Sequence, residues 1–66
     1  MEGDIRLNWQ SLVKAAVKKR KVQGFTQEQL AVLAGVSKPT LNRFEQCDTS
    51  ITLSNAIKIL GALGLD

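Results

Sequence analysis

The chain has 66 residues, of which 44% are hydrophobic and 23% charged, and its formal net charge is +3. This composition predicts one small globular domain rather than a disordered segment, and it excludes a deep catalytic cleft between two subdomains. The chain has one cysteine, Cys47, and no histidine, which excludes an internal disulfide, a zinc finger and a Cys–His nucleophile pair. We therefore expect the Cys47 thiol to be reduced, and we expect no metal, no cofactor and no enzymatic activity.

The first residues, Met-Glu-Gly-Asp, are not followed by a long apolar run. No stretch approaches the roughly 20 apolar residues that cross a bilayer. We therefore expect a soluble, cytoplasmic protein with no membrane partner, in which residues 1–8 are a mobile segment and residues 9–66 form the domain.

A first helix is predicted over residues 9–22, because apolar residues recur at helical spacing and no strand-like alternation of period two is present. Gly24 is expected to end this helix in the left-handed conformation. The residues of the apolar stripe are Trp9, Leu12, Val13, Ala16 and Val17.

A second, short helix follows at once. Thr26 is a suitable N-cap, Gln29 completes a capping box, and Gly35 ends the run. A helix of this length is marginal in water, so packing against the rest of the domain must hold it.

A third helix is predicted to begin after Ser37, with Pro39 in its first turn. Leu41 and Phe44 then point to one side of it. A polar, turn-like stretch, residues 46–51, separates this helix from the next.

Thr52 is predicted to cap a last helix that ends at Gly64. Gly61 lies inside it at a cost of roughly 1 kcal/mol relative to Ala, which we interpret as the close approach of another helix. The predicted apolar face consists of Leu53, Ala56, Ile57, Leu60 and Leu63.

The second and third helices are joined by so few residues that they must cross steeply. Ala31 is small where the helices approach, Gly35 permits a positive φ, and Val36 fills the corner. With Leu41 and Phe44 anchoring it from beneath, the third helix exposes the start of its polar face.

This polar face suits the edges of bases in a DNA groove. Asn42 can donate to and accept from adenine, and Lys38 and Arg43 can reach guanine O6 and N7. Pro39 and the Thr40 methyl group can contact the methyl group of thymine. Backbone N–H groups at the starts of both helices can bind phosphate oxygens.

The charge distribution agrees with a surface that faces phosphate. Between Lys14 and Arg43 there are seven basic residues and one acid, Glu28, a balance of +6, while the other acids lie outside this interval. A solvated lysine face on a helix explains the same pattern, so charge alone does not decide between the two.

The segments FTQEQLAVLAGVS, TLNRFEQ and TLSNAIKILGALGL resemble the Cro/C1-type (XRE family) helix-turn-helix domain over roughly residues 9–65. The resemblance implies an all-α, compact four- to five-helix lambda-repressor-like bundle. A weaker similarity, in the loop length and the TLSNAIKIL stretch, is to HipB-type antitoxins.

The resemblance also implies roles for individual residues. Base contacts are expected from Lys38, Pro39, Thr40, Asn42 and Arg43, and a phosphate contact from Gln27. The loop after the third helix is basic and binds phosphate in many family members, but here it reads Gln-Cys-Asp-Thr-Ser. We expect Thr49 and Ser50 to bind phosphate in its place through backbone N–H and hydroxyl groups, and Ser37 to do so at the start of the third helix. Arg20 and Glu45 match an internal ion pair that ties the first helix to the end of the third.

The function expected from these features is sequence-specific binding of double-stranded DNA by a homodimeric transcriptional regulator, more specifically a repressor. The helix from about Lys38 to Glu45 would lie in the major groove. Two alternatives stay open. One is an antitoxin that represses its own operon and binds a toxin protein, and the other is a helical protein-interaction module without DNA binding.

Overall fold

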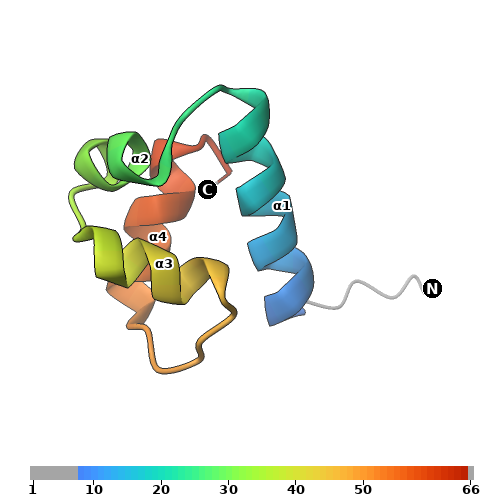
Figure 1. The fold of residues 1–66 in the computed structure, drawn as a ribbon. Helices are drawn as coiled ribbons and strands as arrows, with labels where there is room; N and C mark the ends of the chain where they lie inside the picture. The colour runs from blue at the N-terminus through green and yellow to red at the C-terminus, as the bar shows by residue number, and fades with distance from the viewer. Residues whose placement is uncertain (1–7, 66) are drawn as a thin grey trace.

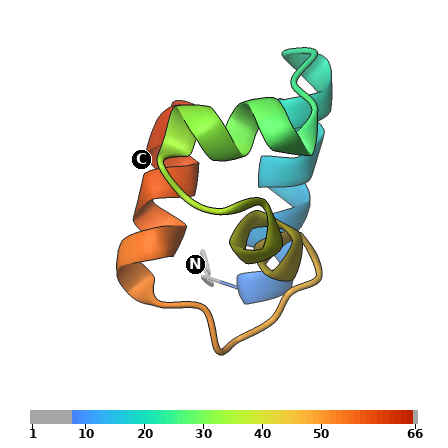
Figure 2. The ribbon, with the colours of Figure 1, turned by 60° about the vertical axis from the view of Figure 1, so that its left-hand side comes forward.

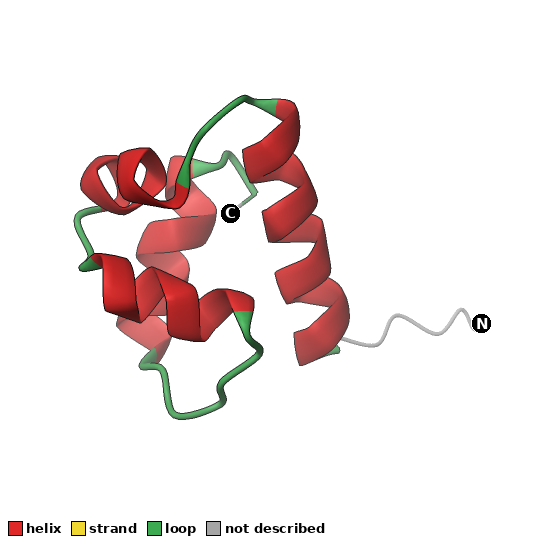
Figure 3. Cartoon of the chain, in the orientation of Figure 1, coloured by secondary structure: helices red, strands yellow, loops and turns green. Residues whose placement is uncertain are grey.

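The computed structural model describes residues 8–65, which form four α-helices connected by short loops (Figure 1). The helices are α1 (Trp9–Val22), α2 (Gln27–Ala34), α3 (Lys38–Glu45) and α4 (Leu53–Ala62). Within residues 8–65 there is no strand (Figure 3). The predicted all-α bundle is confirmed with four helices. None of these helices is both long and apolar enough to cross a membrane.

Each helix begins at a polar side chain that accepts a backbone N–H group, and each such cap is typically worth about 1 kcal/mol. Thr26, Ser37 and Thr52 cap α2, α3 and α4, as the sequence predicted. Asn8 caps α1 by accepting from Gln10 N at 2.9 Å. The predicted mobility of residues 1–8 otherwise falls on residues that lie outside the described part of the chain.

The helices end in left-handed residues. Gly24 and Gly35 have φ values of 78° and 75°. After each glycine, the next N–H group reaches back to a carbonyl of the last turn, as in the bond from Phe25 N to Arg20 O at 3.0 Å. Cys47 takes this role after α3 with a φ of 64°, a conformation that costs a residue with a Cβ roughly 1–2 kcal/mol.

Helix α3 lies at the centre of the packing, because it contacts each of the other three helices, while α2 also packs against α4. In Figure 2, α3 is seen nearly end-on while α2 runs across the view above it, so the two helices cross steeply. The indole of Trp9 in α1 meets the ring of Phe44 edge-on, with 5.5 Å between ring centroids. The buried core consists of Val13, Ala16, Leu30, Ala31, Leu41, Phe44, Ala56, Ile59 and Leu63.

The buried face of α4 differs from the one predicted. Ile59 is fully buried, whereas Leu53 and Ile57 are 77% and 53% exposed. The apolar residues of this helix cover a broader arc than the roughly 100° stripe of a helix with one buried face, so the sequence left open which part of the arc turns inward. Gly61 is exposed, so the interpretation of close helix packing at this position was wrong.

Candidate nucleic-acid interface

The corner between α2 and α3 is built as its sequence requires. Gly35 adopts φ 75° and ψ 31°, and both Gly35 N and Val36 N donate to Ala31 O, at 2.9 and 3.0 Å. A Cβ at position 35 would meet no atom within 4 Å, so the glycine is needed for its backbone conformation and not for space. The chain therefore reverses within three residues and starts α3 at the Ser37 cap.

Two buried side chains hold α3 from beneath. Leu41 and Phe44 are fully buried, and they fix which face of the helix points outward. On that outward face Lys38, Asn42 and Arg43 are exposed. Pro39 is also exposed, and Thr40 is half-buried.

The first turn of α3 is tied together by its own hydroxyl groups. Thr40 N donates to Ser37 Oγ at 3.2 Å, and the Ser37 hydroxyl donates to Thr40 Oγ1 at 2.8 Å. The Ser37 side chain is therefore engaged inside the helix. A backbone N–H group at the start of α3 is left to bind an anion, because first-turn N–H groups have no acceptor within the helix.

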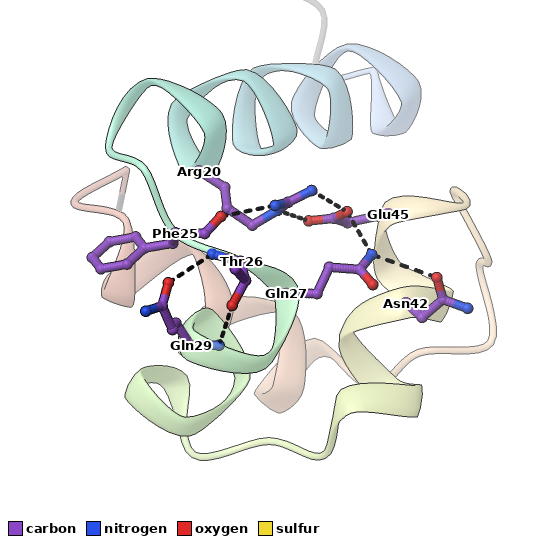
Figure 4. Close-up of polar contacts among 7 residues, drawn as sticks. All are labelled: Arg20, Phe25, Thr26, Gln27, Gln29, Asn42 and Glu45. Carbon is purple, nitrogen blue, oxygen red and sulfur yellow. Dashed lines mark hydrogen bonds and ion pairs between the residues drawn. The ribbon is translucent and has the colours of Figure 1, made fainter.

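Arg20 and Glu45, the pair expected from the resemblance, lie together between α1 and the end of α3 (Figure 4). Arg20 Nε donates to Glu45 Oε2 at 2.7 Å, and Arg20 Nη2 donates to Glu45 Oε1 at 3.1 Å. Arg20 Nη1 also donates to Phe25 O at 2.9 Å. The two side chains are only 12% and 10% exposed, so this bidentate pair is largely removed from water.

Gln27 extends this pair toward the surface of α3 (Figure 4). Its Nε2 donates to Glu45 Oε1 at 2.8 Å and lies 3.5 Å from Asn42 Oδ1. The side chain expected to bind phosphate thus turns inward, toward a carboxylate. Since Gln27 is the first residue of α2, its backbone N–H group still lies at the helix start, where anions bind.

The starts of α2 and α3 enclose a shallow hollow. Gln27 lines it from α2, and Lys38, Pro39 and Asn42 line it from α3. A positive side chain, two amides and the starts of two helices therefore meet at one exposed place. This combination of donors favours an anionic or hydrogen-bonding ligand, such as the phosphates or the base edges of a nucleic acid.

The loop after α3 carries an ordered carboxylate. Asp48 Oδ1 accepts from Ser50 N at 2.8 Å. The Ser50 backbone N–H group lowers the pKa of Asp48 most, followed by the Ser50 hydroxyl and then, more weakly, by the positive charge of Arg43. Thr49 and Ser50, the residues predicted to contact phosphate in this loop, are exposed beside this acid.

Sequence reasoning missed the inward orientation of Gln27 and its contact with Glu45. The two residues are eighteen positions apart and come from different helices, and nothing in their spacing indicates that they meet. Only the crossing of α2 over the end of α3 brings them together.

Comparison with known proteins gives two findings. A family model described as helix-turn-helix matches residues 18–66. A protein of Haemophilus influenzae named an uncharacterized HTH-type transcriptional regulator is 35% identical over 63 residues, which cover 96% of this chain and 61% of that protein. The chain thus spans less than two thirds of the length of this relative.

Proposed function

Because this chain belongs to the helix-turn-helix family, we propose that it is a DNA-binding transcriptional regulator that places α3 in the major groove of double-stranded DNA. The observation that carries the proposal is the outward face of α3, which is polar, basic and held rigidly by Leu41 and Phe44. The similarity to the HTH-type transcriptional regulator of Haemophilus influenzae supports the same function. A protein of this kind acts where the DNA lies, so we also place it in the cytoplasm.

The proposed contacts fall into two groups. Base edges are read by the exposed side chains of α3, with Arg43 and Lys38 suited to guanine and Pro39 and Thr40 to the methyl group of thymine. Phosphates are bound by the starts of the two helices and by the loop after α3. The phosphate-binding residues are Gln27 and Ser37, through their backbone N–H groups, together with Thr49 and Ser50.

We further propose that the protein binds as a homodimer and represses transcription. Leu53 and Ile57 on α4 leave large apolar side chains in water, at 77% and 53% exposure, and a second copy is the simplest partner to cover them. Two copies related by a twofold axis would read two half-sites about one helical turn apart. Repression would follow if such a site overlaps a promoter.

Selection of bound duplexes from a random pool, read by sequencing, tests the proposal. We expect an enriched palindrome and an affinity that falls steeply with salt as counterions are released from phosphate. Arg43→Ala should weaken binding by about 1–3 kcal/mol and relax one base position. Lys58→Ala, which removes an exposed positive charge from α4, should leave the base preferences unchanged.

Two results would overturn the proposal. One is recovery of no preferred sequence by the wild-type protein, and the other is an identical loss for Arg43→Ala and Lys58→Ala on every duplex. Light scattering of the protein alone and with the selected duplex measures the proposed dimer, and a single copy bound to the complete palindrome would contradict it.

A further inference from the structure

The ion pair between α1 and α3 is connected to the exposed amide of Asn42 through a single side chain. Glu45 Oε1 accepts from Arg20 Nη2 at 3.1 Å and from Gln27 Nε2 at 2.8 Å. The same Gln27 Nε2 faces Asn42 Oδ1 at 3.5 Å (Figure 4). Three helices therefore contribute to one line of polar groups that begins at a nearly buried cation and ends at the surface.

The chemistry of each member fixes the orientation of the next. A carboxylate only accepts hydrogen bonds, and both oxygens of Glu45 accept them from Arg20. The Gln27 amide must therefore turn its nitrogen, and not its oxygen, toward Glu45. Because this nitrogen also faces Asn42, the Asn42 amide must present its oxygen to Gln27.

The alternative orientation of Asn42 is unfavourable. Rotating this amide by half a turn would place its two N–H groups against those of Gln27, so that donors would face donors at about the same distance. The contact at 3.5 Å is long for a hydrogen bond and contributes little energy as such. The contact matters because it selects one of the two orientations of the Asn42 amide. For this selection it is enough that the flipped amide is repelled by the N–H groups of Gln27.

With its oxygen turned toward Gln27, Asn42 presents its N–H groups to the solvent. Asn42 is exposed on α3 and lines the hollow with Lys38 and Pro39. A bidentate pair with adenine, expected from the sequence, needs both the oxygen and the nitrogen of the amide to face the base. Here the oxygen faces Gln27, which leaves the nitrogen to meet a base in the groove.

From this geometry we infer that Asn42 is a specificity-determining donor, oriented by Gln27 and Glu45, and that it selects a base edge with acceptors only. Guanine, through O6 and N7, and thymine, through O4, offer such an edge in the major groove, whereas adenine also offers a donor there. This inference rests on the proposed function, because it assumes that α3 lies in the groove. Gln27 acts in it as a positioning residue.

Base-preference profiles of four proteins test the inference, each measured by selection from a random duplex pool. Asn42→Ala identifies the base pair that Asn42 contacts, as the position that loses preference. At that position the wild type should select guanine or thymine over adenine by about fivefold or more, and the profile shows directly which of the two is preferred.

Gln27→Ala keeps the backbone N–H group at the start of α2 but removes the group that orients Asn42. At the base pair of Asn42 the preference for guanine or thymine should fall to within about twofold of adenine, while the other positions keep their preferences. Asn42→Asp, which has acceptors only, should shift the same position toward cytosine, which offers a donor. Far-UV circular dichroism of each variant confirms that it is folded before its profile is interpreted.

The possible failures are distinguishable. If the wild type selects no sequence, the proposed function itself is wrong. The inference is overturned if the wild type selects a clear motif but prefers adenine at the position of Asn42, or if the Gln27→Ala profile equals that of the wild type. In both cases the proposed binding of DNA through α3 stands. An Asn42→Ala profile equal to that of the wild type overturns the inference in the same way.

Discussion

Replacing Glu45 with alanine tests whether the ion pair between α1 and α3 holds the domain together. The substitution removes three hydrogen bonds, two from Arg20, at 2.7 and 3.1 Å, and one from Gln27, at 2.8 Å. Arg20 keeps only its bond to Phe25 O, in a site where its side chain is 12% exposed. An uncompensated charge in such a place is strongly unfavourable.

The loss can be estimated from these contacts. Breaking a buried ion pair by removing one partner lowers the free energy of unfolding by about 3–5 kcal/mol. Arg20 keeps some contact with water and its hydrogen bond to Phe25 O, so we expect a loss at the low end of this range, about 3 kcal/mol. A domain of this size has a total stability of about 3–10 kcal/mol. Its midpoint temperature should therefore fall by more than about 10 °C.

Thermal and urea denaturation, followed by circular dichroism, measure this loss. Glu28→Gln is the matched control, because Glu28 is an exposed acid on α2, and its effect should stay below about 1 kcal/mol. A double-mutant cycle with Arg20→Ala should give a coupling of about 1–3 kcal/mol. Losses for Arg20→Ala and Glu45→Ala that simply add, or a Glu45→Ala midpoint equal to that of the wild type, would refute the reasoning.

Three further substitutions give expected outcomes. Gly35→Ala should cost about 1–2 kcal/mol in urea denaturation, because φ is 75° there and no steric clash is present to add to the penalty; an unchanged midpoint would mean that the corner relaxes. Thr52→Ala should cost about 1 kcal/mol by the same measurement, since Thr52 Oγ1 accepts from Asn55 N at 3.1 Å, and Thr52→Ser should restore most of it. Asp48→Asn should change the pH dependence of the midpoint temperature. Because the folded pKa of Asp48 lies below its ordinary value of 3.8, its carboxylate stabilises the fold above that pH and loses this effect as the pH falls through the folded pKa. The wild-type curve should therefore drop slightly more than that of Asp48→Asn at acidic pH, and superimposable curves would contradict the assignment.

The sequence predicts the fold well because its helix ends are marked by residues with local functions. Thr26, Ser37 and Thr52 bind N–H groups of their own first turns, and Gly35 supplies a conformation that other residues avoid. Such signals involve only residues close in the chain. Helix boundaries therefore follow from the sequence without knowledge of the packing.

The choice of the buried face of α4 needed the structure. Leu53, Ile57 and Ile59 all belong to one broad apolar arc, and only the placement of α2 and α3 decides that Ile59 turns inward.

The orientation of the Gln27 side chain also needed the structure, for a related reason. Its position at the start of α2 indicates a phosphate contact, but the carboxylate that captures its side chain comes from another helix.

The contact between Trp9 and Phe44 makes the domain easy to follow by optical methods. Trp9 is the single tryptophan and the chain has no tyrosine, so intrinsic emission comes almost wholly from one indole. This indole lies against α3 on its buried side, through Phe44, while the proposed DNA-reading side chains point the other way. Its fluorescence should therefore report the docking of α1 onto α3, and a titration with duplex should leave this signal nearly constant while unfolding changes it strongly.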